Sequence, residues 1–203
     1  MKWNYPLKTV RITQRFGENS QVYKRFGLAG HNGVDFGCAT GTALYAPCSM
    51  TIKVIGDQGN EGYGRYVRTW TTDGYELTFG HLLSVNPEVK VGTVLAQKTI
   101  FAYTDNTGFS TGPHLHFGVR KLTSTHEIDN YNNGYKGAIN PLPFFMDDNE
   151  AVETLDPEHV AAIKWVSENH IMNIVDANTL GEPMSRKDLA LVVHRLYKLI
   201  KNV

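Results

Sequence analysis

Short runs of β-branched and aromatic residues occupy most of the first 146 positions, and many of them predict strands. Glycine, asparagine, aspartate and proline bound these runs, and Asp73-Gly74 lies between two of them as in a hairpin turn. Many short strands with turn signals favour a sandwich or barrel of antiparallel sheets. The expected strands are 44–46, 49–55, 66–71, 76–82, 93–103 and 114–121.

The pattern changes to a helical one after the proline-rich segment 140–143. Asp156 is a good N-cap before Pro157, and Ser185 with Asp188 resembles a capping box. The second helix carries apolar residues on one face at Leu189, Val192, Val193, Leu196, Leu199 and Ile200.

These patterns predict a mainly β domain over residues 1–146, an acidic linker over 147–155 and a small two-helix domain over 156–203. Two helices in about 50 residues bury little apolar surface alone. We therefore expect the helical domain to pack on the β domain, on a second copy of itself in a homodimer, or on a partner such as the cell wall.

Composition removes several classes of function. Twenty basic residues balance twenty acidic ones, so bulk charge gives no argument for nucleic acid or for an anionic membrane. No apolar stretch approaches the length of a membrane span, so we expect no membrane insertion. Residues 1–8 contain no apolar core of a signal peptide. Cys38 and Cys48 make no disulfide framework and are interpreted as small, partly buried thiols.

Two histidines, His114 and His116, lie two positions apart in a predicted strand. Side chains at i and i+2 point to the same face of a strand, about 7 Å apart along the backbone. They can therefore share one site, and one of them can bind a metal while the other contacts a substrate or water.

His31 and Asp35 would be about 13 Å apart in a straight strand, too far to bind one ion. Gly33 between them allows the chain to bend. Two histidines and one carboxylate form a known catalytic zinc set that leaves a fourth position open. His81 supplies a further imidazole, whereas His126, His159, His170 and His194 are interpreted as structural or surface residues.

The order of these motifs resembles the lysostaphin-type (M23) zinc metallopeptidases. The family pattern is His-x3-Asp, then Gly-His-Leu, then Gly-Pro-His-Leu-His-Phe, and the chain carries it at 31–35, 80–82 and 112–117. Supporting matches are Tyr45-Ala46-Pro47, Gly62-Tyr63-Gly64, the stretch 107–112 that leads to the His-x-His strand, and Ile139-Asn140-Pro141. The resemblance covers roughly residues 8–145 and implies a lysostaphin-like antiparallel β catalytic domain.

The resemblance implies a role for each of five residues. His31, Asp35 and His116 would bind one Zn²⁺ per chain. His81 and His114 would be the catalytic pair that orients and deprotonates the attacking water and stabilises the oxyanion.

Three tyrosines are candidates for substrate binding. Tyr23 is the nearest match to a tyrosine that assists in some relatives, although its spacing differs. Tyr131 and Tyr135 lie in a segment, 123–136, that is longer than the usual link in the family, and we expect them to line the substrate groove. Phe79 and Gly118 depart from the residues common in the family, tyrosine and glutamate, but neither is a metal ligand.

The function that the resemblance implies is zinc-dependent endopeptidase hydrolysis of the peptide stems or cross-bridges of bacterial peptidoglycan. The layout suggests a bacteriophage lysin, present in the host cytoplasm before holin-dependent release or associated with the virion. Two other functions stay open at this point. One is a non-catalytic module that binds the wall or activates another hydrolase, and the other is a zinc hydrolase of soluble peptides.

Overall fold

The computed structural model describes residues 3–145, which form one compact unit within 1–145. The linker predicted over 147–155 and the two helices predicted over 156–203 lie outside the described residues, so their roles in wall binding or dimerisation stay predictions.

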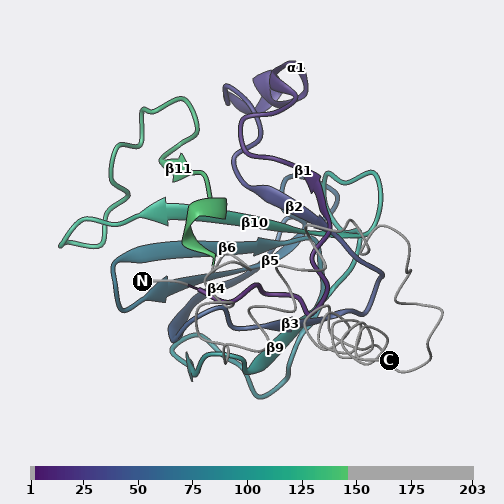
Figure 1. The fold of residues 1–203 in the computed structure, drawn as a ribbon, viewed down its shortest axis with the longest axis vertical. Coiled ribbons are helices and arrows are strands. Elements are labelled where there is room, and N and C mark those ends of the chain that lie inside the picture. The colour runs from purple at the N-terminus through teal and green to yellow at the C-terminus, as the bar shows by residue number, and fades with distance from the viewer. Residues whose placement is uncertain (1–2, 146–203) are drawn as a thin grey trace, which may run out of the picture. The chain divides into compact units, whose positions relative to one another are not determined.

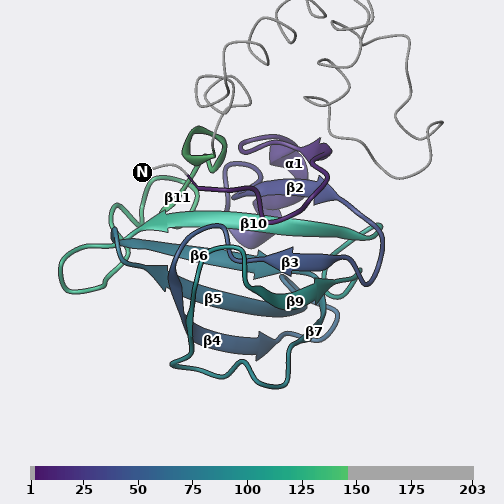
Figure 2. The same cartoon turned by 60° about the horizontal axis from the view of Figure 1, so that its bottom comes forward.

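Two antiparallel sheets make up the described residues (Figures 1 and 2). The main sheet has the order β1-β2-β10-β6-β5-β4-β8, with β11 paired to β10, and the smaller sheet has the order β3-β9-β7. The strands are β1 Ile12–Gln14, β2 Val34–Gly37, β3 Ala43–Tyr45, β4 Met50–Asp57, β5 Arg65–Thr71, β6 Tyr75–Gly80, β7 Leu82–Val85, β8 Val94–Leu95, β9 Ile100–Thr104, β10 His114–Lys121 and β11 Ala138–Ile139. The helical segments are α1 Ser20–Tyr23, η1 Lys24–Phe26 and η2 Leu142–Phe144.

The mainly antiparallel fold predicted from the sequence is confirmed, and the Asp73-Gly74 turn joins β5 to β6 with Gly74 at φ 85°. The predicted strand 76–82 is in fact two strands, because His81 has a positive φ of 60°. The chain leaves the main sheet at this residue and enters the smaller sheet. The predicted strand 93–103 is likewise divided into β8 and β9.

The core lies between the two sheets and is built from aromatic contacts. Phe79 of β6 packs edge-to-face on Phe101 of β9, with ring centroids 4.9 Å apart, and on Phe117 of β10, at 5.2 Å. All three are fully buried. Figure 2 shows β3 and β9 layered over the main sheet, as these contacts require. Phenylalanine at position 79 therefore has a packing role.

Strand β10 separates the core from the opposite face of the main sheet. Leu115, Phe117 and Val119 belong to the buried core cluster. Because side chains alternate along a strand, His114, His116, Gly118 and Arg120 face the other way. The chemistry-bearing residues thus share the outer face of the main sheet.

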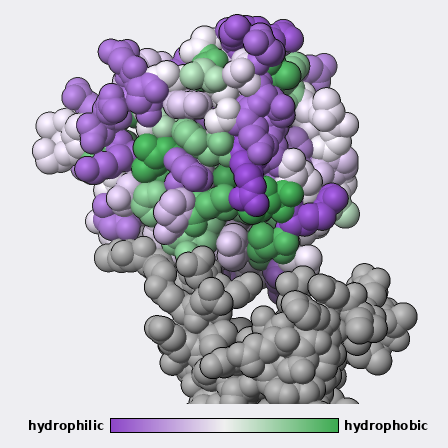
Figure 3. Space-filling model, turned by 45° about the horizontal axis from the view of Figure 1, so that its top comes forward, coloured by the Kyte–Doolittle hydropathy of each residue, from purple (hydrophilic) through white to green (hydrophobic). Residues whose placement is uncertain are grey.

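Two segments project from the side of β10 that is uppermost in Figure 1. They are the α1 segment and the loop between β10 and β11. Figure 3 brings this side forward and shows hydrophilic surface at its top and upper left, with apolar surface between. Within residues 3–145, no helix is long and apolar enough to cross a bilayer.

Candidate metal centre and active site

Strand register brings the predicted residues together. Asp35 of β2 and His116 of β10 are directly paired in the antiparallel ladder, and His116 is paired with Gly80 of β6 on its other side. His81 follows Gly80, and His31 precedes β2 by three residues. The three pieces of sequence therefore converge at adjacent strands.

Three side-chain atoms lie close to one another at this point. His31 Nε2 is 2.9 Å from His116 Nδ1, and each of these nitrogens is 3.1 Å from Asp35 Oδ1. All three residues are buried. Ligands about 2.0–2.1 Å from a tetrahedral zinc ion lie about 3.3–3.4 Å apart, so a small outward shift would make this triangle one face of such a site.

The hydrogen bond that His31 makes on the side away from Asp35 shows which ring nitrogen is free to bind a cation. His31 Nδ1 is 3.2 Å from the carbonyl oxygen of Arg15, which can only accept, so Nδ1 carries the proton. Without a second proton, the ring presents a bare lone pair on Nε2 to the Asp35 carboxylate. This approach is stable only if a proton or a cation lies among the three atoms. The donor set, two imidazoles and a carboxylate, suits Zn²⁺.

His81 and His114 are held in the same way. His81 Nδ1 donates to Thr107 O at 2.6 Å, and His114 Nδ1 donates to Gly112 O at 2.7 Å. Both rings therefore turn Nε2 inward, and His114 Nε2 lies 3.4 Å from Asp35 Oδ2. The ring centroids of His81 and His114 are 4.5 Å apart. Two imidazoles with fixed tautomers thus lie beside the three-residue cluster.

Burial and charge set the protonation of the cluster. Burial alone would raise the pKa of the Asp35 carboxyl, but the adjacent His116 and His31 rings outweigh it and hold that pKa well below its usual range. Burial lowers the pKa of His81 to about 3, and it also lowers the pKa of His116. His81 and His116 are therefore neutral imidazoles beside the Asp35 carboxylate at neutral pH.

Gly33 is required for space. A Cβ at this position would lie 2.6 Å from Cε1 of His116 and 2.6 Å from the carbonyl oxygen of Phe117. Its φ lies outside the left-handed region that favours glycine. The bend between His31 and Asp35 is present, as predicted, and the reason for glycine there is the close approach of β10.

An open cleft of about 610 Å³ is lined by Asp35, His116, His81 and His114, whereas His31 is not among its lining residues. Tyr23 lines it and stacks on the His31 ring, with centroids 5.2 Å apart, while its hydroxyl donates to Gln14 Oε1 at 3.2 Å. Tyr131 also lines the cleft. Tyr135 is not among the lining residues and packs instead on Phe16, with ring centroids 4.5 Å apart.

Other lining residues were not singled out as site residues from the sequence. Tyr63 accepts a hydrogen bond from Asn32 Nδ2 at 2.8 Å, and its ring lies 5.1 Å from the His116 ring. Phe26 of η1 meets Phe109 of the β9–β10 loop, with centroids 5.2 Å apart. The Gly62-Tyr63-Gly64 match gave a sequence signal for Tyr63, and the match over 107–112 gave one for Phe109.

The thiols lie apart from this centre. Neither Cys38 nor Cys48 lines the cleft. Both are half-buried and neither forms a disulfide. Burial raises the pKa of both thiols, that of Cys48 to about 12, so they remain protonated.

Comparison with known proteins identifies the family. The model of peptidase family M23 matches residues 29–133, slightly more than half of the chain. The chain is 34% identical over 114 residues to an uncharacterized metalloprotease of Haemophilus influenzae and 31% identical over 119 residues to the DD-carboxypeptidase/endopeptidase Mpg of Neisseria meningitidis. These matches cover 56% and 57% of this chain.

The solved structure of the antimicrobial peptidase lysostaphin from Staphylococcus simulans has the same fold. The TM-score is 0.54 at 28% identity, and the match covers 67% of this chain and 49% of that one. An antiparallel β scaffold with a His-Asp-His cluster in a cleft defines a metallopeptidase-type domain. The chain belongs to peptidase family M23. It spans about a quarter of the length of the two curated relatives, 23% and 25%.

Proposed function

We propose that this protein is a zinc-dependent endopeptidase that cleaves the peptides of bacterial peptidoglycan. The observation that carries the proposal is the convergence of three ligand atoms within 3.1 Å, beside two further imidazoles, in an open cleft. His31, Asp35 and His116 are the proposed ligands of one Zn²⁺ per chain. When bound, the metal would polarise a carbonyl and lower the pKa of a water molecule.

His81 and His114 are the proposed catalytic residues. Each donates its Nδ1 proton to a backbone carbonyl, so Nε2 is the nitrogen of the neutral ring that is left to accept a proton. An imidazole in this state can take a proton from the attacking water and return it to the leaving amine. Once protonated, it can also donate a hydrogen bond to the oxyanion.

Peptidoglycan is the proposed substrate because of the relatives. The relatives include an antimicrobial peptidase and a DD-carboxypeptidase/endopeptidase, both hydrolases of peptide bonds. Tyr23 and Tyr131 add aromatic surface to the lining of the cleft.

Chelation should abolish the activity. Purified protein incubated with bacterial cell walls is expected to lower turbidity and release free amines, and excess chelator is expected to stop both, because the ligand set would be emptied. Added zinc should restore both signals. If amines were released equally with and without chelator, or from no wall type at all, the proposed function would be wrong.

The role of a bacteriophage lysin is a further part of the proposal, and it rests on the sequence expectation alone. We expect the full chain, expressed in a bacterial cytoplasm, to lyse the host only when a holin is coexpressed. A catalytically inactive variant with the same holin is the control. Lysis without the holin would argue against holin-dependent release.

A further inference from the structure

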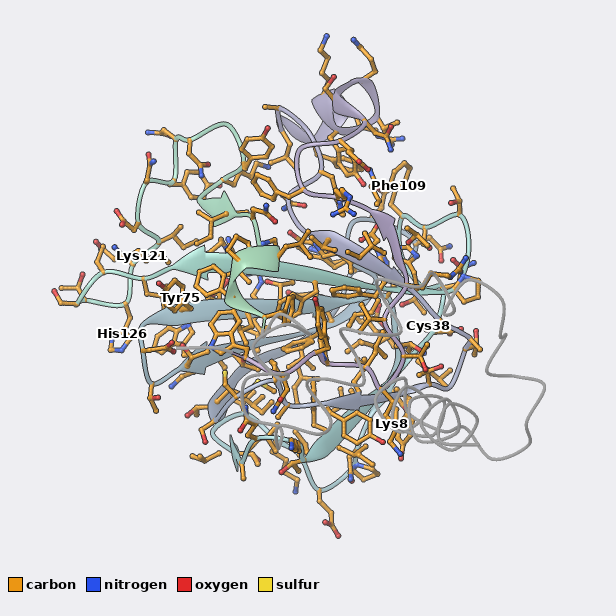
Figure 4. The ribbon with its side chains drawn as sticks, viewed as in Figure 1. Lys8, Cys38, Tyr75, Phe109, Lys121 and His126 are labelled. Carbon is orange, nitrogen blue, oxygen red and sulfur yellow. The ribbon has the colours of Figure 1, made fainter. Side chains whose placement is uncertain are left out.

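The lining of the cleft continues along β10 beyond the His31-Asp35-His116 cluster. This further part of the lining carries positive charge. Gly118 and Arg120 follow His116 on the same face, and Arg120 lies about 13 Å from His116 along the strand. Register pairs Arg120 with Glu76 of β6. In Figure 4, Phe109 is labelled near the α1 segment and Lys121, the last residue of β10, on the opposite side of the view.

Two arginines share one carboxylate on this floor. Arg120 Nη2 donates to Glu76 Oε1, and Arg68 Nε lies 3.9 Å from the same oxygen, beyond hydrogen-bonding distance. The side chains of Arg68, Arg120 and Glu76 are 27%, 14% and 12% exposed, respectively. Because a single carboxylate faces two guanidinium groups, a net charge of +1 remains in a partly desolvated place.

Arg68 is held in position but is not satisfied. Its guanidinium lies over the rings of Tyr66 and Tyr63, with its central carbon 5.2 and 5.9 Å from their centroids. Its Nε is buried and has no hydrogen-bond partner among the described residues. A buried, unpaired donor costs free energy unless a ligand satisfies it. The Arg68 guanidinium therefore has hydrogen-bond donor capacity that the described residues leave unused.

The part of the cleft between the His31-Asp35-His116 cluster and the two arginines is open. Gly118 pairs with Thr78 of β6, and Thr78 pairs with Arg68 of β5, so one row of the floor carries only small side chains before Arg68. A Cβ at Gly118 would make only ordinary contacts, 3.5 Å or more, so the absence of a side chain leaves space above the floor. Lys136 adds another positive charge among the lining residues.

We propose that Arg68 and Arg120 form a binding site for a carboxylate group of the substrate peptide. An extended peptide advances about 3.3 Å per residue. This carboxylate therefore lies about two to four residues from the scissile peptide bond, which lies beside His31, Asp35 and His116. Planar guanidinium groups bind carboxylates with paired hydrogen bonds, which gives both affinity and orientation.

This inference rests on the proposed function and narrows its substrate. A cross-bridge made only of glycine has no side-chain carboxylate, whereas a peptide stem that contains acidic residues has one. The site therefore favours stems over glycine bridges. The carboxylate could come from a side chain or from a chain terminus, and the experiment separates these two sources.

The test measures peptide binding rather than hydrolysis. The full-length chain carrying His114→Ala, loaded with zinc, is titrated with synthetic stem tetrapeptides in four forms: unmodified, amidated at the acidic side chain, amidated at the C-terminus, and amidated at both. We expect amidation at one of the two places to weaken binding about tenfold, equivalent to about 1.4 kcal/mol. The place that matters identifies the source of the carboxylate.

Two variants in this background then test the arginines. Arg68→Gln is expected to reduce the tenfold preference to less than threefold. Glu76→Gln is expected to increase affinity for the unmodified peptide severalfold, because it removes the competing carboxylate, and a purely structural role for Glu76 would not produce this gain. Arg65→Gln is the matched control: Arg65 lies on the same strand, is half exposed and pairs with Asp57 outside the cleft.

The proposal is overturned if all four peptides bind equally, or if the preference survives in both Arg68→Gln and Arg120→Gln. Thermal unfolding of each variant excludes misfolding as the cause of a lost preference. Failure here with chelator-sensitive wall hydrolysis intact would reject only the carboxylate site. Failure of wall hydrolysis would reject the proposed function and leave the binding result standing by itself.

Discussion

Replacing Asp35 by asparagine is expected to lower zinc affinity by at least a hundredfold and to abolish wall hydrolysis. Asp35 Oδ1 lies 3.1 Å from the ring nitrogens of both His31 and His116, so it is the anionic member of the proposed ligand set. Asparagine keeps the size of the side chain and removes the charge. A neutral amide oxygen compensates a divalent cation poorly, whereas the surrounding packing is unchanged.

Zinc content after gel filtration and thermal unfolding with and without zinc measure this effect separately from activity. A ligand that binds only the folded state stabilises it by about 4 kcal/mol at a thousand times its Kd. The wild type should show such a zinc-dependent rise in unfolding temperature, and Asp35→Asn should not. Asp57→Asn, which changes a half-exposed carboxylate outside the cleft, is the control. A variant that kept one zinc per chain would show that Asp35 is not a ligand.

Replacing His114 by alanine is expected to lower wall hydrolysis while leaving zinc affinity unchanged. Zinc binding should persist, because His114 reaches the outer oxygen of Asp35 and is not in the three-residue cluster. Hydrolysis should fall by about 10²–10⁴-fold, the usual contribution of a positioned general acid–base group. Metal content and the rate of amine release from cell walls are the two measurements.

His126→Ala is the matched control for this experiment. His126 stacks on Trp70, with ring centroids 4.5 Å apart, and lies outside the lining of the cleft (Figure 4). If His114→Ala kept full activity, His114 would have no catalytic role. If neither wild type nor variant hydrolysed walls but both bound them, the protein would be a non-catalytic wall-binding module.

The sequence predicted the strands that carry visible alternation or long β-branched runs, such as β4, β5 and β10. It missed β1, β2 and β11, because runs of two to four residues are too short to show a period. It joined β6 to β7, because local pattern gives no sign that His81 adopts a positive φ. That conformation is maintained by surrounding contacts, including a hydrogen bond from His81 N to Tyr63 O at 2.8 Å.

The five residues of the candidate site could be named from the motif order, since their types and spacing are specific. The sequence could not show how they meet, because that depends on the pairing of β2 with β10 and of β10 with β6. Tyr131 and Tyr135 show the same limit. They are four residues apart in one loop, yet only Tyr131 lines the cleft, whereas Tyr135 packs on Phe16.

By itself, the sequence determined the family, the mainly β character of the first 145 residues and the donor types of a metal site. These properties depend on residue identity and local spacing, which the chain carries directly. Only the tertiary structure decided which nitrogen of each histidine faces the cleft and that Arg68 and Arg120 share one carboxylate. These features arise from strand register and from backbone carbonyls distant in the chain, such as that of Thr107, which orients His81 from 26 residues away.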